Sequence, residues 1–135
     1  MSQKRLALIA ILVPEYDAGI AFFVETLGFT LLQDTPLSET KRWVRVGTPG
    51  QGTEFLIARA VDDQQAAIGN QGGGRVWLFL ETDDFATDYA AMTAKGVHFE
   101  TAPRDEPYGT VAVFHDPFGN RWDLIQYART DRAHQ

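Results

Sequence analysis

The sequence contains no cysteine, which excludes disulfides, thiolate nucleophiles and cysteine-ligated zinc. Basic residues are also few: 12 Lys and Arg against 18 Asp and Glu give a formal net charge of −6. That balance disfavours a nucleic-acid backbone as partner, because binding to phosphates needs clustered Lys and Arg. No apolar run approaches the roughly 20 residues of a membrane span. These absences predict a cytoplasmic protein that binds neither nucleic acid nor membrane.

What is present is a core-forming composition and an internal repeat. Hydrophobic residues make up 44% of 135, enough for one domain spanning 1–135. A strand, a helix and three further strands follow each other twice, about 68 residues apart. The predicted parts are a first βαβββ module at 5–60, a connector at 61–73 and a second module at 74–128. A functional residue in one module should therefore have a counterpart in the other.

Capping and turn residues set the expected boundaries of the two helices. Asp17 is expected to cap the first helix, and Gly28 to end it in a left-handed conformation. In the second module Asp83 or Asp84 caps the helix, and Gly96 ends it. The apolar run 6–13 before the first helix predicts a buried strand rather than a signal peptide.

Two segments of the second module predict connections between strands. Asp116-Pro117-Phe118-Gly119 suits a type I turn, with Asp first, Pro second and Gly fourth. The polar segment 104–109 predicts a surface loop, whose Arg104 and Tyr108 could alternatively cover a binding site.

These motifs together resemble the vicinal oxygen chelate superfamily, which includes glyoxalase I, extradiol dioxygenases and bleomycin-resistance proteins. The carrying segments span nearly the whole chain: 13–17, 21–23, 27–29, 82–85, 95–97, 114–120 and 123–126. The resemblance implies an α+β fold in which two βαβββ modules form a cup-shaped sheet, completed in a homodimer. It also implies that the cup holds a small-molecule site.

Metal-using members of this superfamily place four ligands in the cup, on the first and last strand of each module. Carried over by position, those places hold Leu8, Leu56, Trp77 and Asp123. Only Asp123 offers an oxygen donor, and one carboxylate does not hold a divalent ion. The sequence therefore predicts a member without the usual metal ligands, with no metal and no cofactor.

Strand alternation predicts an apolar and aromatic lining for the cup with few charged groups, as in ligand pockets generally. An inward Asp123 should have a raised pKa unless Arg75 or Arg121 pairs with it, in which case it is a structural ion pair. The expected ligand-binding residues are Leu8, Trp43, Leu56, Trp77, Phe79, Tyr108, Arg121 and Asp123.

Three functions fit these features, and the sequence favours the first. It is a metal-independent small-molecule binder resembling bleomycin-resistance proteins. The second is a metal-dependent lyase, isomerase or dioxygenase of the same superfamily. The third is a metal-free acid-base enzyme, with Asp123, His115 or Tyr108 as its candidate catalytic residues.

Overall fold

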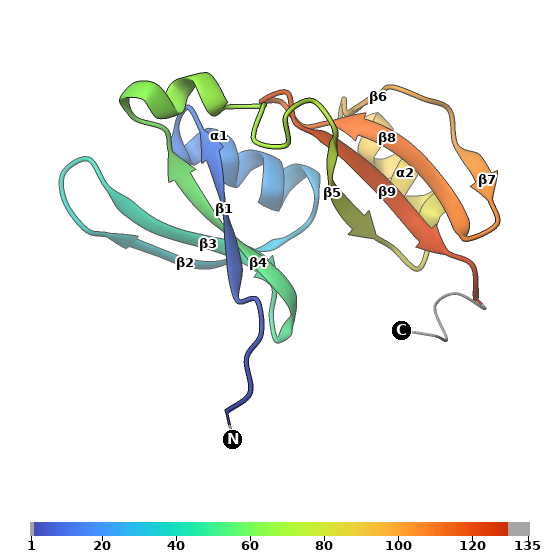
Figure 1. Ribbon diagram of the computed structural model, residues 1–135, viewed down its shortest axis with the longest axis horizontal. Helices are drawn as coiled ribbons and strands as arrows, with labels where there is room; N and C mark the ends of the chain where they lie inside the picture. The colour runs from blue at the N-terminus through green and yellow to red at the C-terminus, as the bar shows by residue number, and fades with distance from the viewer. Residues whose placement is uncertain (1, 130–135) are drawn as a thin grey trace. The chain divides into compact units, whose positions relative to one another are not determined.

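The computed structural model describes residues 2–129 and divides the chain into two compact units, Met1–Ile68 (unit 1) and Gly69–Gln135 (unit 2). Each unit holds one β-sheet and one main helical segment, so the mixed α+β class expected from the sequence is confirmed (Figure 1). Within 2–129, none of the helices has the length and apolar character that crossing a membrane requires.

Unit 1 has a four-stranded sheet in the order β1-β4-β3-β2, with β1 and β4 parallel and the other pairs antiparallel. Its elements are β1 (Leu8–Val13), α1 (Tyr16–Ile20), the π-helical segment η1 (Ala21–Thr26), β2 (Thr30–Pro36), β3 (Arg42–Thr48), β4 (Gln51–Arg59) and the 3₁₀ segment η2 (Asp62–Ala67).

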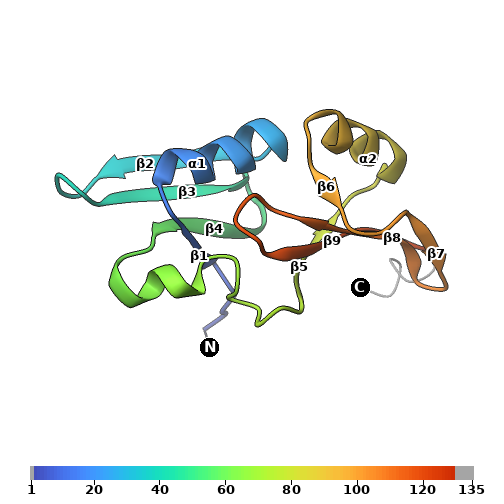
Figure 2. The ribbon, with the colours of Figure 1, turned by 90° about the horizontal axis from the view of Figure 1, so that it is seen from above.

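Alternation along these strands separates a buried face from a helix-free face. Ile11, Val44, Val46 and Ile57 are fully buried beneath α1 and η1, which cover this side of the sheet (Figure 2). The helical segment is anchored by Phe23, whose ring lies 5.1 Å from that of Phe55 on β4. The register of the strands places on the opposite, helix-free face of unit 1 the residues Leu8, Ala10, Leu12, Trp43, Arg45, Glu54, Leu56 and Ala58.

Of the two residues predicted to mark the ends of the first helix, Gly28 is confirmed and Asp17 is not. Gly28 has φ +81°, the left-handed conformation predicted for the residue that ends the helix. The prediction that Asp17 caps the helix is wrong, because the N-cap is Glu15 and no side chain bonds the first turn. Asp17 lies inside that turn and accepts a hydrogen bond from Arg42 Nη1 at 3.0 Å. Its carboxylate therefore ties the helix to β3.

Unit 2 repeats the arrangement with one added short strand. Its elements are β5 (Val76–Glu81), α2 (Phe85–Ala94), β6 (His98–Phe99), β7 (Arg104–Glu106), β8 (Gly109–His115) and β9 (Arg121–Tyr127). The sheet order is β5-β9-β8-β6, with β7 also paired to β8. Asp84 caps α2 as predicted, accepting a hydrogen bond from Thr87 N at 3.3 Å. Segment 104–109 is not a plain loop as predicted: it holds β7, the turn at 107–108 and the first residue of β8, and Arg104 pairs with Val111 in a β-hairpin.

The core of unit 2 is a run of aromatic rings between α2 and the sheet. Tyr89 of α2 contacts Phe99, which contacts Phe114, which stacks on the buried Trp122 at 5.5 Å between ring centroids. Such contacts add to the burial of large apolar surfaces. The register places on the helix-free face of unit 2 the residues Phe79, Glu81, Arg104, Val111, Val113, His115, Arg121, Asp123 and Ile125.

The predicted turn at 116–120 is confirmed and is tightly bonded. Gly119 N donates to Asp116 O at 3.2 Å, as a β-turn requires. The buried Asp116 carboxylate accepts five further hydrogen bonds, three from backbone N–H groups and two from the side chains of Asn120 and Trp122. The turn therefore fixes the start of β9.

Candidate functional site

The candidate site of unit 2 is centred on Asp123, in the middle of β9. This strand lies between β5 and β8, and its register sets Phe79 on one side of Asp123 and Val113 on the other. Ile125 follows on the same face and is also buried. Asp123 is therefore a carboxylate in largely apolar surroundings.

Asp123 has an unsatisfied oxygen. The residue is 8% exposed, and among the described residues no hydrogen-bond donor reaches its buried Oδ1. Burial raises the pKa of Asp123, and the positive charge of Arg104 opposes that rise in part. This is the direction that the sequence led us to expect for an Asp123 without an arginine partner. A hydrogen-bond donor or a cation placed beside Oδ1 would relieve the cost of burying this group.

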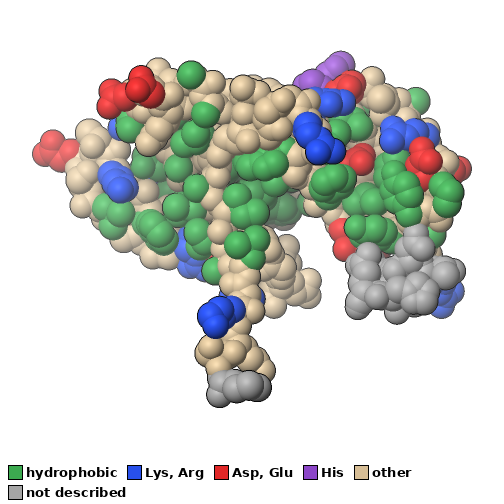
Figure 3. Space-filling view, viewed as in Figure 1, with side chains coloured by type: hydrophobic (Ala, Val, Ile, Leu, Met, Phe, Trp, Pro, Cys, Tyr) green, Lys and Arg blue, Asp and Glu red, His purple; other side chains and the backbone are tan. Residues whose placement is uncertain are grey.

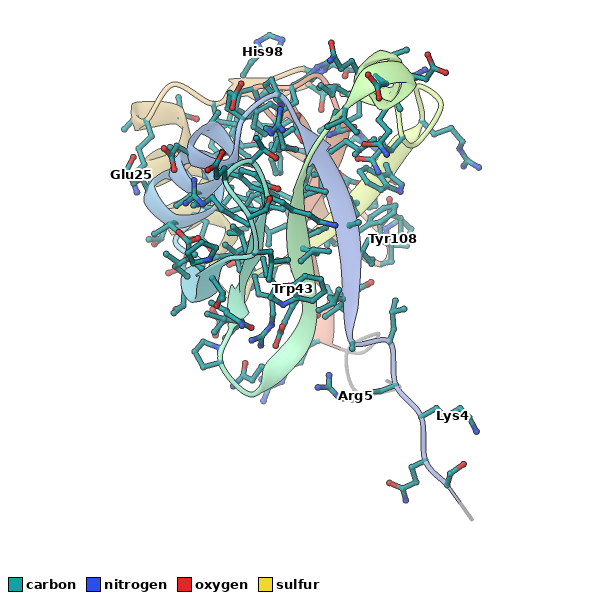
Figure 4. All side chains as sticks on the ribbon, turned by 90° about the vertical axis from the view of Figure 1, so that its left-hand side faces the viewer. Lys4, Arg5, Glu25, Trp43, His98 and Tyr108 are labelled. Carbon is teal, nitrogen blue, oxygen red and sulfur yellow. The ribbon has the colours of Figure 1, made fainter. Side chains whose placement is uncertain are left out.

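Arg121 does not neutralise Asp123 because it is engaged elsewhere. Its guanidinium donates to both oxygens of Glu100, at 3.0 and 2.7 Å, and to Gly74 O at 3.1 Å. His115 Nε2 lies 2.7 Å from the same Glu100 carboxylate. Hydrogen bonds from Arg121 and then His115 lower the pKa of Glu100 to about 2. The ring of His98 lies 5.4 Å from that of His115, and its side chain extends away from the fold in Figure 4.

Three aromatic residues predicted to line the site differ in their surroundings. Phe79 is 61% exposed although it pairs directly with Asp123, and Tyr108 is 40% exposed at the tip of the β7–β8 hairpin. Trp77 lies at a bulge, where β5 advances two residues against one on β9. The bulge interrupts the alternation expected from Trp77 to Phe79. Trp77 packs on Gly72, whose added Cβ would lie 2.5 Å from the Cβ of Trp77.

In unit 1 the corresponding helix-free face is apolar. This face includes Leu8, Leu56 and Trp43. The match of Leu56 with Asp123, which came from the sequence repeat, agrees with the observed strand pairing: both residues lie on the helix-free face of the last long strand of their unit. Hydrophobic side chains cover the strands of unit 1 in Figure 3, and the Trp43 side chain lies among these strands in Figure 4. The ion pair between Arg45 and Glu54, at 2.8 Å, is the charged element of this face.

A cavity of about 360 Å³ opens at the end of this sheet, between the start of β3, the end of β4 and η2. Trp43 and Leu56, both expected at a ligand site, contribute to its wall. Sequence reasoning missed the other lining residues, among them Lys41, Arg59, Val61 and Gln64. Val61 and Gln64 follow β4 in a segment without a periodic pattern, so no sequence signal placed them beside Trp43 and Leu56.

The residues at the superfamily's metal positions do not fit a divalent ion. Leu8, Leu56 and Trp77 offer no ligand atom, and only Asp123 carries a carboxylate. Within residues 2–129, no three His, Asp or Glu side chains come together in a way that could hold a metal. The chemistry open to this site is hydrogen bonding, charge pairing and proton transfer at Asp123.

Comparison with known proteins agrees with this architecture. A family model described as the Glyoxalase/Bleomycin resistance protein/Dioxygenase superfamily matches residues 5–124. An uncharacterised protein of Shewanella frigidimarina (strain NCIMB 400) is 51% identical over 92% of this chain and 94% of its own.

Two solved structures from Streptomyces sp. CB03234 are also similar. The antibiotic binding protein TnmS3 has 30% identity and a TM-score of 0.76, covering 95% of this chain and 99% of its own. A glyoxalase/bleomycin resistance protein has 31% identity and a TM-score of 0.69, covering 90% of this chain and all of its own. The chain therefore belongs to the glyoxalase/bleomycin resistance protein/dioxygenase superfamily.

Proposed function

We propose that this protein is a metal-independent small-molecule-binding protein whose ligand presents a cation or a hydrogen-bond donor to Asp123. The observation that carries the proposal is the buried Oδ1 of Asp123, which lacks a partner among the described residues. Buried polar groups are nearly always bonded, so an exception on a helix-free sheet face suggests a place for a ligand atom. The similarity to an antibiotic binding protein supports the same class of function.

The surroundings of Asp123 suit a ligand with a planar apolar part. Phe79 offers an exposed ring directly beside the carboxylate, and Tyr108 offers a second exposed ring. An apolar wall with one charged anchor is the usual composition of a small-molecule site. The predicted homodimer and cytoplasmic location remain predictions.

Binding of matched naphthalene probes to the full-length protein tests this proposal by calorimetry. The 2-naphthylmethylammonium cation should bind more tightly than neutral 2-naphthylmethanol, because Asp123 gains a charge-assisted hydrogen bond only with the cation. Asp123→Asn should remove this preference. The control Asp83→Asn, which removes an equal charge at an exposed position, should keep it. Prior dialysis against a chelator should change nothing.

Two results would contradict the proposal. One is a wild-type protein that binds the ammonium probe no better than the alcohol. The other is binding that disappears on chelation and returns with an added divalent metal, which would support a metal-dependent enzyme instead.

A second candidate function is acid-base catalysis without a metal. The raised pKa of Asp123 favours it, since a carboxylate with a raised pKa is a stronger base. His115 lies on the same face of the sheet, with its Nε2 bonded to Glu100. An isomerase activity with a rate that follows the ionisation of Asp123, and that Asp123→Ala abolishes, would establish this function. Tight binding without turnover would leave binding as the function.

A further inference from the structure

We propose that the cavity beside Trp43 in unit 1 is a second binding site, and that it takes a planar aromatic carboxylate. The cavity volume of about 360 Å³ lies within the range of small-molecule pockets, roughly 300–1,000 Å³. All of its lining residues belong to unit 1, and the observations that support it do not involve Asp123.

The wall of the cavity suits an aromatic ring. Trp43 and Leu56 line it from β3 and β4, and Ala58 adds a small side chain that leaves room beside the indole. Val61, an exposed hydrophobic residue 41% accessible to solvent, also lines the cavity. A flat apolar ligand between these groups would bury the indole face and Val61 together.

The charge at the cavity is positive. Three basic residues line it and no acidic residue does. Arg42 is already committed: it donates to Asp34 at 3.0 and 2.6 Å and to Asp17 at 3.0 Å, and its guanidinium lies 5.2 Å from the ring centroid of Tyr16. Its charge is therefore neutralised by Asp34 and Asp17 and is not available to a ligand.

The other two cations are available. Neither Lys41 nor Arg59 forms an ion pair with another residue in the described range 2–129. Arg59 makes one long hydrogen bond, from Nη2 to Thr40 O at 3.4 Å. Glu15 and Glu39 line an adjoining depression that shares Arg42 and Arg59 with the cavity, and in the described range neither carboxylate forms an ion pair with Arg59. The cavity thus presents an ammonium and a guanidinium, and the planar fork of a guanidinium matches the two oxygens of a carboxylate.

Calorimetry with two probes of equal shape tests the charge preference directly. The full-length protein should bind 2-naphthoate about tenfold more tightly than 2-naphthamide, since only the acid gains charge-assisted bonds. Arg59→Gln and Lys41→Gln should each reduce that preference severalfold. Lys4→Gln serves as the matched control, because Lys4 is an exposed cation that does not line the cavity. Circular dichroism of each variant checks that the fold is retained.

The location of binding is read separately by NMR. Titration with 2-naphthoate should shift the indole N–H signal of Trp43 and leave that of the fully buried Trp122 in place. The two proposals fail separately, because this one is read from naphthoate binding at Lys41 and Arg59 and the other from binding of the ammonium probe at Asp123. The proposal is overturned if naphthoate does not bind, if naphthamide binds equally well, or if Lys4→Gln weakens binding as much as Arg59→Gln.

Discussion

Replacing Asp123 by Asn should stabilise the protein at pH 7, although most substitutions of buried residues destabilise. The Oδ1 atom is buried and has no hydrogen-bond partner among residues 2–129, and such a group costs about 1–3 kcal/mol. Asn keeps the shape and removes the charge, but it leaves one polar atom unsatisfied. The lost attraction to the exposed Arg104 is weak, because solvent screens the charge of that side chain. The net expected gain is about 1 kcal/mol.

The gain should depend on pH in a defined direction. Burial raises the pKa of Asp123 in the folded protein above the unfolded value of about 3.9. The folded state therefore keeps its proton to higher pH, and the wild type loses stability as the pH rises between the two values. Above the pKa of Asp123 in the folded protein, the carboxylate is charged and the full cost of burying that charge is present. The advantage of Asn should be full at pH 7 and should shrink as the pH falls toward about 4.

Urea unfolding of the wild type and Asp123→Asn at pH 7 and pH 4 measures both effects, with Asp83→Asn as an exposed control. A gain of about 1 kcal/mol corresponds to roughly 3–5 °C in the midpoint of thermal unfolding. A variant that is less stable than the wild type at pH 7 would refute the reasoning. It would mean that the folded protein already supplies a favourable partner to the carboxylate.

Three further substitutions test the scaffold. Asp116→Ala should lower the free energy of unfolding by about 3–5 kcal/mol in urea titrations, since five hydrogen bonds to a buried carboxylate are lost; a loss below 1 kcal/mol would contradict this role. Gly72→Ala should lower the thermal midpoint, because its Cβ would lie 2.5 Å from that of Trp77; an unchanged midpoint would show that the connector shifts freely. Glu100→Gln should destabilise at pH 7, and the difference from wild type should fade as the pH drops from about 4.5 toward 2, through the lowered pKa of Glu100; a difference that stays constant with pH would refute it.

The parts of the fold that local chemistry controls were predictable from the sequence. Gly28 and Asp84 act at helix ends because backbone conformation and capping depend on neighbouring residues only. The equivalence of Leu56 and Asp123 followed from the repeat, because side-chain direction alternates with a fixed period of two.

The features that depend on contacts between segments distant in sequence were not predictable from the sequence. The bulge at Trp77 depends on how β5 meets β9, and no residue type at that position signals it. Arg121 forms an ion pair with Glu100, 21 residues away in the sequence, so its charge does not neutralise Asp123. Asp17 looked like a cap, but the helix begins at Tyr16, so Asp17 lies inside the first turn and bonds Arg42 of β3 instead. Each error arises from a contact between elements distant in sequence.

The position of Val61 and Gln64 bears on how ligand preference can change over generations. Both line the cavity of unit 1 from the segment after β4, outside the sheet and its buried face. The exposed Val61 can be exchanged at little cost in stability, whereas the Gln64 side chain accepts a hydrogen bond from Val61 N, and Leu56 and Trp43 are constrained by their strands. New specificity can therefore be sampled by mutation in this segment while the scaffold is left intact.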